Sequence, residues 1–290
     1  MSSTLADDIR NRLGTLSPAE RKVARVLLAG YPSAVFETVA TIAERAAVSA
    51  PTVLRFAARL GYRGFPELQA ALRTELDARN ASPLTLYEST DFARDGEARD
   101  GSRPGALERA RAVLPPALVQ TCAEIPPHDF ERAVTLLADR KRHITLVGGR
   151  FTHLLAQYLG LHLMQLRQDV RVLPDRPVER TAALAQLTKR DVVVLFDYRR
   201  YEDDKTAIAQ LVRENAGKVI VFTDPWLSPA ATHADVVLPS QVGTLSPYDS
   251  LVPTLAVVEA LVAGVIDALG SGAHQRMKSY EEVARRSGLV

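Results

Sequence analysis

The sequence predicts an all-α N-terminal domain followed by an α/β domain built on a doubly wound, parallel sheet of five strands. Apolar residues keep helical spacing through residues 1–79, and no strand-like alternation precedes residue 140. From His143 onward, short apolar runs alternate with helical stretches, which is typical of parallel strands buried on both faces. The length of 290 residues also fits two domains.

The composition predicts a soluble, cytoplasmic protein with no membrane partner. The single cysteine, Cys122, excludes an internal disulfide framework and fits a reducing compartment. The N-terminus lacks the basic-then-apolar order of a signal peptide. The most apolar segment, 251–269, contains Glu259 and Asp267, which argue against a membrane span. A net charge of +2 decides neither for nor against nucleic acid as a partner.

The N-terminal helices include one with a clear start. Ser17-Pro18-Ala19-Glu20 places serine at the cap, proline in the first turn and glutamate three residues after the serine. Apolar residues at helical spacing follow it, at Val23, Val26 and Leu27. We therefore expect a capped helix from about residue 17.

Residues 38–60 (TVATIAERAAVSAPTVLRFAARL) predict a helix-turn-helix motif. A first helix turns Ile42, Ala43 and Ala46 inward, and small residues at 47–49 allow a tight turn. Ser49 then caps a second helix, which has Pro51 in its first turn. That helix has an apolar stripe (Val53, Ala57, Leu60) and a polar one (Thr52, Arg55, Arg59).

The polar stripe suits a recognition helix in the major groove of DNA. A guanidinium fork can bond guanine O6 and N7, or a phosphate, at two points. The simpler alternative is that Arg55 and Arg59 only solvate an outer helix face. The agreement of turn, cap and arginine spacing favours the recognition helix.

The run TIAERAAVSAPTVLRFAARLGYRGFPELQ (residues 41–69) closely resembles the N-terminal domain of the RpiR-type regulators, as does LSPAERKVA (16–24). The resemblance implies a C-terminal sugar isomerase (SIS) domain that senses sugar phosphates. It implies a helix-turn-helix DNA-binding domain at 1–79, a linker with connecting helices at 80–128, and a SIS-like ligand-sensing and dimerisation domain at 129–290. Six side chains would then approach a double-stranded DNA operator: Ser49, Thr52, Arg55, Arg59, Tyr62 and Arg63.

The stretch between the domains predicts a mobile connection. Residues 91–105 hold several charges and three glycines, which is typical of a linker or long loop. Prolines at 104, 115–116 and 126–127 predict two or three short helices after it.

Five apolar runs predict the strands of the second domain: 144–147, 170–173, 192–196, 219–222 and 236–238. A helix at 129–140 leads into them, and a long apolar helix at 253–269 follows. Ligands of such sheets bind at the carboxyl ends of the strands. The loops after the first and third strands are therefore the place to look for a site.

The loop after the first strand, Gly148-Gly149-Arg150-Phe151-Thr152, predicts a phosphate cradle, because it opens a helix and offers a hydroxyl. It resembles the first SIS loop, usually Gly-x-Gly-x-Ser, with Arg150 in place of the second glycine. An arginine at a positive φ would be strained. Either the turn differs here, or the Arg150 side chain enters the pocket.

The loop after the third strand departs further, because Asp197-Tyr198-Arg199-Arg200-Tyr201 replaces the usual Ser-x-Ser-Gly cluster. Three interpretations stay open. The arginines, with Arg150, can bind an anion; Asp197 can pair with an arginine and leave room for a less phosphorylated ligand; or the residues form a salt-bridge cluster facing solvent or a dimer partner. The candidate effector-binding residues are Gly148, Gly149, Arg150, Thr152, Asp197, Arg199, Arg200 and Ser246.

We therefore predict a DNA-binding transcriptional regulator whose SIS-like domain senses a small, anionic, carbohydrate-derived effector such as a sugar phosphate. We expect a homodimer or homotetramer, and no cofactor, metal site or catalytic residue. One alternative is a sugar-phosphate isomerase-like enzyme, which needs a Glu and a His at the site. His153, His162 and His233 form no obvious pair with an acid at a loop end, and HExxH, CxxC and P-loop patterns do not occur. The other alternative is a regulator whose SIS domain only dimerises.

Overall fold

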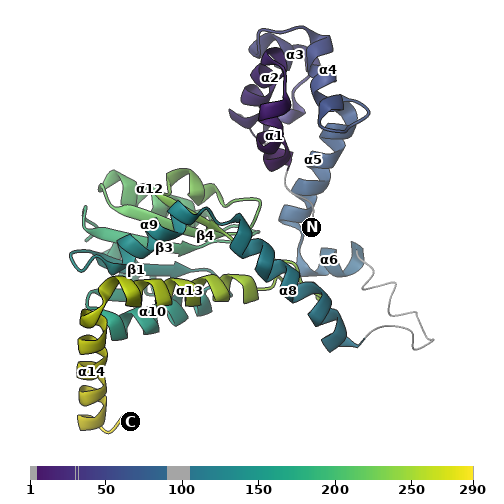
Figure 1. Ribbon diagram of the computed structural model, residues 1–290. Coiled ribbons are helices and arrows are strands. Elements are labelled where there is room, and N and C mark those ends of the chain that lie inside the picture. Colours follow the sequence, from purple (N-terminus) through teal and green to yellow (C-terminus); the bar gives the residue numbers. More distant parts are fainter. Residues whose placement is uncertain (1–4, 30, 32, 90–104, 290) are drawn as a thin grey trace. The chain divides into compact units, whose positions relative to one another are not determined.

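The computed structural model describes residues 5–29, 31, 33–89 and 105–289. The chain divides into two compact units, Met1–Ala81 and Ser82–Val290 (Figure 1). Buried hydrophobic residues form one cluster in the first unit and two in the second. The predicted linker at 91–105 lies outside the described residues except for Gly105.

The first unit is all helical. The described elements are α1 (Leu5–Arg12), α2 (Pro18–Ala29), α3 (Val39–Arg45), α4 (Ala50–Arg59) and α5 (Phe65–Asn80), with 3-10 turns at Leu13–Thr15 and Ser33–Phe36. The predicted start of α2 is confirmed: the Ser17 N–H donates to Glu20 Oε2 (2.8 Å), and the Glu20 N–H donates to Ser17 Oγ (3.3 Å).

The core of the first unit is formed by the inward faces of these helices. Ile9, Val23, Ile42, Phe56 and Leu68 are all fully buried in one cluster. The predicted apolar stripe of α4 is confirmed by the burial of Val53, Ala57 and Leu60, and Phe56 joins it. Packing on this core fixes which face of α4 remains exposed.

The second unit begins with α6 (Pro83–Ser89) and α8 (Ala106–Glu124). The prediction of two or three short helices after residue 104 was wrong for 106–124, since α8 continues through Pro115 and Pro116. Each proline removes a hydrogen bond to the carbonyl four residues earlier. Arg111, Ala112 and both prolines are exposed, so water can satisfy the freed carbonyls while Ala117 and Thr121 pack inward.

A parallel sheet of five strands forms the centre of the second unit, as predicted. The strands are β1 (His143–Gly148), β2 (Val170–Val172), β3 (Asp191–Phe196), β4 (Lys218–Thr223) and β5 (Val236–Pro239), in the order β2-β1-β3-β4-β5. All four pairings are parallel. The order reverses at β1, so the carboxyl ends of β1 and β3 flank the switch point where such sheets bind ligands.

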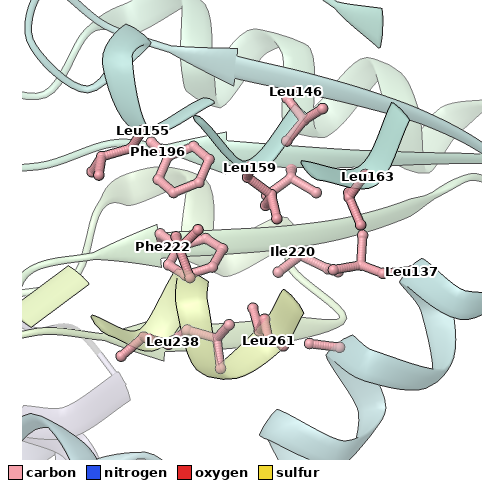
Figure 2. Packing of buried hydrophobic residues seen from close by; sticks show 14 of the residues in the cluster. Leu137, Leu146, Leu155, Leu159, Leu163, Phe196, Ile220, Phe222, Leu238 and Leu261 are labelled. Carbon is pink, nitrogen blue, oxygen red and sulfur yellow. The ribbon is translucent and has the colours of Figure 1, made fainter. Parts of the chain in front are cut away.

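Helices cover both faces of the sheet (Figure 1). α9 (Pro127–Ala138), α10 (His153–Leu166) and α13 (Val252–Leu269) pack on one face, and α11 (Pro177–Leu184) and α12 (Asp203–Glu214) pack on the other. Figure 2 shows the first of these layers, in which Phe196 and Phe222 stack with ring centroids 4.4 Å apart. The central strands β3 and β4 are buried on both sides, so their apolar runs show no polar alternation, whereas the edge strand β2 is only half-buried.

Two C-terminal helices complete the unit. By length and composition α13 is apolar enough to cross a membrane, but one of its faces packs into the core through Val257, Val258 and Leu261. α14 (Ser271–Arg286) was not predicted, because its sequence is mostly polar and only Ala273 on it is buried. It contacts α10 and α13.

Candidate nucleic-acid interface and ligand pocket

The helix-turn-helix of the first unit is built from α3, a tight turn and α4. Thr38 caps α3, because its Oγ1 accepts the Thr41 N–H (3.1 Å). Ala47 in the turn has a φ of 49°, a left-handed conformation that a small residue tolerates at modest cost. Gly61 ends the motif at a φ of 96°, where any side chain would be strained.

The predicted polar stripe of α4 is divided between the surface and the core. Arg55 and Arg59 are exposed, whereas Thr52 is only 5% exposed. Ser49 occupies the N-cap position, but its side chain makes no capping bond. Its Oγ lies 3.0 Å from Thr52 Oγ1, which in turn accepts a hydrogen bond from Arg55 Nη2 (3.1 Å). Instead of the expected cap, Ser49 thus joins a row of side-chain hydrogen bonds through Thr52 that orients Arg55.

The remaining predicted DNA-contact residues differ in how they are held. Arg59 lies 3.9 Å from Glu20, whose pKa is lowered first by the hydrogen bond from the Ser17 backbone and further by Arg59. Arg63, 92% exposed, pairs with Glu67 at 3.0 Å. Tyr62 is half-buried, and that burial raises the pKa of its phenol. The DNA-binding roles of all six residues stay predictions.

Leu54 is a surface feature of α4 that the sequence reasoning missed. It is 46% exposed and sits beside Arg55, with Ala50, Pro51 and Ala58 also exposed on the helix. Its apolar character alone would place Leu54 in the core, but the structure shows that Phe56 is the buried residue.

In the second unit, a pocket opens at the carboxyl ends of β1 and β3. Its volume is about 160 Å³. It is lined by the two predicted loops and by residues of the last loop: Gly149, Arg150, Phe151, Thr152, Phe196, Asp197, Tyr198, Arg199, Arg200, Glu202, Tyr248, Asp249 and Leu251. The structure thus brings together most of the predicted effector-binding residues.

The first loop is closely packed around its two glycines. A Cβ on Gly148 would lie 2.4 Å from the His153 nitrogen, and one on Gly149 would lie 2.8 Å from Glu202 Oε1. The Thr152 hydroxyl accepts the Gly149 N–H (2.7 Å) and donates to the Phe196 carbonyl (2.9 Å). These two hydrogen bonds tie the first loop to β3, and Thr152 is only 7% exposed. The φ of Arg150 is not positive, so the turn does not require glycine at this position.

The second loop holds a buried carboxyl. Asp197 is 3% exposed, accepts the Ser228 hydroxyl in a short hydrogen bond and accepts the Glu202 N–H (3.3 Å). Burial raises its pKa to about 6, although the Ser228 bond acts in the opposite direction. Next to it, burial also raises the pKa of Tyr198, whose hydroxyl lies 2.6 Å from Thr254 Oγ1.

The pocket cations are mostly paired with acids. Arg199 Nε donates to Asp249 (2.8 Å), and the guanidinium carbon lies 5.8 Å from the centroid of the Trp226 ring. Arg200 lines the pocket at a φ of 65° and forms no ion pair with any residue that the structure describes. A strained non-glycine residue at a pocket is a pointer to function.

Two of the predicted effector-binding residues, Gly148 and Ser246, do not line this pocket. The Ser246 hydroxyl accepts the Tyr248 N–H at 3.2 Å. His162 packs edge-on against Tyr158, and Glu259 accepts the Tyr158 hydroxyl (3.2 Å), so neither joins the pocket. In the described part of the chain, no group of three or more His, Cys, Asp or Glu could hold a metal ion.

Comparisons with known families assign both units. The family model described as "Helix-turn-helix domain, rpiR family" matches residues 3–79, and the "SIS domain" model matches residues 136–264. The chain belongs to the RpiR-type transcriptional regulators. These matches confirm the predicted family. They also confirm the prediction of a transcriptional regulator rather than an enzyme.

The chain matches two curated transcription regulators over most of their length. It is 29% identical to HexR of Pseudomonas aeruginosa over 90% of this chain and 88% of that protein. It is 27% identical to HexR of Escherichia coli over 98% of this chain and 95% of that protein.

Two solved structures show the same fold. The sugar isomerase domain of an RpiR transcription factor from Sphaerobacter thermophilus is 28% identical, with a TM-score of 0.54 over 57% of this chain and 92% of that one. The Vibrio vulnificus NanR protein, in complex with ManNAc-6P, is 17% identical, with a TM-score of 0.53 over 98% of both chains.

Proposed function

We propose that this regulator binds double-stranded operator DNA through the exposed face of α4. The observation that carries the proposal is Arg55, an exposed arginine whose guanidinium is oriented by Thr52 and is in no ion pair within the described residues. An oriented, unpaired guanidinium at the middle of a recognition helix can bond guanine in the major groove. Arg59 and Arg63 have carboxylate neighbours, so a phosphate contact by either would compete with an existing carboxylate.

The proposed role of Arg55 can be tested by fluorescence anisotropy at several salt concentrations, with labelled DNA from the promoter region of the regulator's own gene. Arg55→Ala should weaken binding about 10- to 100-fold, corresponding to roughly 1–3 kcal/mol for a bidentate base contact. Lys189→Ala, which removes an exposed charge from the second unit, is the matched control and should change affinity little. Equal affinity of Arg55→Ala and the wild type would refute the role of Arg55.

We further propose that the pocket of the second unit binds a phosphorylated sugar or a related anion. Support comes from the first-loop N–H groups at the start of α10, the unpaired Arg200, and the position at the switch point of the sheet. The ManNAc-6P complex of NanR supports the same ligand class.

Binding of effector is tested by thermal shift and by operator affinity in the presence of glucose 6-phosphate, related hexose phosphates and glucose. A phosphate ester should raise the melting temperature and change operator affinity about 5- to 150-fold, while glucose should do neither. Arg200→Ala should lose the response. A regulator whose second unit only dimerises would show no stabilisation by any of these compounds.

We also propose a cytoplasmic homodimer or homotetramer assembled through the second unit. α10 exposes Leu154 and Leu161, 65% and 61% exposed, and α13 exposes Val252. Apolar surface of this kind is usually covered by a partner. Light scattering of the wild type and of Leu154→Glu/Leu161→Glu tests it: a smaller assembly for the variant supports the proposal, and a monomeric wild type overturns it.

A further inference from the structure

A carboxylate of the protein itself occupies the first loop of the pocket. Glu202 lies just before α12, and its Oε1 accepts the Arg150 N–H (3.3 Å) and lies 3.9 Å from Arg150 Nε. The same carboxylate packs against the face of Gly149, where a Cβ would come within 2.8 Å of it. The backbone N–H that a phosphate would use is therefore already bonded to an anion.

The other oxygen of Glu202 binds a buried lysine. Lys205 is 1% exposed, and its Nζ lies 2.7 Å from Glu202 Oε2 and 2.7 Å from Asp204 Oδ1. A buried ammonium must be paired, because leaving it alone costs several kcal/mol. Glu202 itself is only half-buried, so its side chain can swing into solvent without crossing the core.

Glu202 also takes up part of the pocket, because it is one of the residues that line a volume of about 160 Å³. Moving this glutamate side chain out would enlarge the pocket, free the Arg150 N–H and leave Lys205 with Asp204 as its one remaining carboxylate partner among the described residues.

Building on the proposed function, we infer that Glu202 is an internal competitor of the effector, and that the effector's phosphate group displaces it and takes over the Arg150 N–H and Lys205 Nζ. Lys205 is thus a phosphate-binding residue, and Glu202 sets how strongly the pocket binds anions. A phosphate carries more negative charge and more acceptor oxygens than a carboxylate, so it can pair with both groups and with Arg200. A neutral sugar offers no group that replaces the carboxylate at Lys205.

The test compares the affinity of the wild type and of Glu202→Gln for inorganic phosphate, glucose 6-phosphate and glucose, by isothermal titration calorimetry of the full chain. Glutamine keeps the size of the side chain but removes the competing charge. We expect Glu202→Gln to bind inorganic phosphate and glucose 6-phosphate about 10-fold or more tightly than the wild type, with glucose unchanged. Glu214→Gln, at the far end of α12, is the matched control and should bind as the wild type does.

Lys205 is tested in the Glu202→Gln background. Lys205→Met should remove the gain in affinity for inorganic phosphate and for glucose 6-phosphate. Lys205→Arg keeps the charge and should retain part of that gain, so it supplies the test if the methionine variant does not fold. Unchanged or weaker phosphate binding by Glu202→Gln, when the wild type binds glucose 6-phosphate, overturns the competition while leaving the proposed function intact. No binding of any phosphate by any of these proteins overturns the proposed function and the inference with it.

Discussion

The buried carboxyl of Asp197 makes a prediction about stability and pH. Burial raises its pKa from 3.8 to about 6, while Ser228, the Glu202 N–H and Lys205 lower it and the charge of Glu202 raises it. The folded protein therefore favours the neutral carboxyl. The stability that this gives is fully present below about pH 3.8 and is lost as the pH rises through 6.

The size of the effect follows from the two pKa values. A difference of about two pKa units corresponds to about 3 kcal/mol of lost stability at pH 7.5, and to about half of that at pH 5. Asp197→Asn removes the charge and keeps an acceptor for the Ser228 hydroxyl, but its amide opposes the Glu202 N–H, which costs about 1 kcal/mol. We expect the variant to be more stable than the wild type by about 2 kcal/mol at pH 7.5 and by less than 1 kcal/mol at pH 5.

The assay is urea unfolding at the two pH values, followed by the fluorescence of Trp226. This is the only tryptophan of the chain, and it lies in the second unit, so it reports on that unit alone. The exposed Asp203 supplies the control, because Asp203→Asn should change the free energy of unfolding by less than about 0.5 kcal/mol. A difference between Asp197→Asn and the wild type that is the same at both pH values would refute the reasoning.

Two further predictions concern α4. Thr52→Val keeps the buried shape and removes the hydroxyl that orients Arg55, so operator affinity should fall about 2- to 10-fold with the melting temperature within a few degrees of the wild type; an unchanged affinity in the anisotropy assay would contradict it. Leu54→Ala should reduce the preference for a thymine at one operator position by about 1 kcal/mol without changing the salt dependence, because an exposed, uncharged side chain can contact a thymine methyl but neutralises no phosphate. An unchanged base preference at every position, measured on operator DNA with single-base substitutions, would contradict it.

Much of the fold could be predicted because its signals are local. The capping box at Ser17 and the five apolar runs depend on neighbours in the sequence, and the structure confirms them. The single helix α8 could not be predicted, because whether Pro115 and Pro116 break a helix depends on which face is buried. The helix α14 was not predicted, although Ala273, Met277, Tyr280 and Ala284 lie at helical spacing in its mostly polar sequence.

The sites were predicted less completely, for a related reason. Periodicity assigns Thr52 to the polar stripe of α4, but a small hydroxyl at the boundary can be buried if a neighbour uses it, as Arg55 does. Arg150, Arg199 and Arg200 could be recognised as pocket residues from the strand-end loops alone. Their partners Glu202 and Asp249 could not, because Asp249 comes from a loop 50 residues away and Glu202 carries no motif.

The two candidate sites use charge in opposite ways, and this difference bears on how each responds. Arg55 is held by a neutral hydroxyl, so binding an anion there breaks no ion pair. In the pocket, Arg199 is paired with Asp249 and Lys205 with Glu202, so an incoming anion that binds either of these cations must replace a carboxylate. Breaking such a pair offsets part of the gain from the new one. The pocket should therefore bind an anion more weakly than the same cations would without their carboxylate partners.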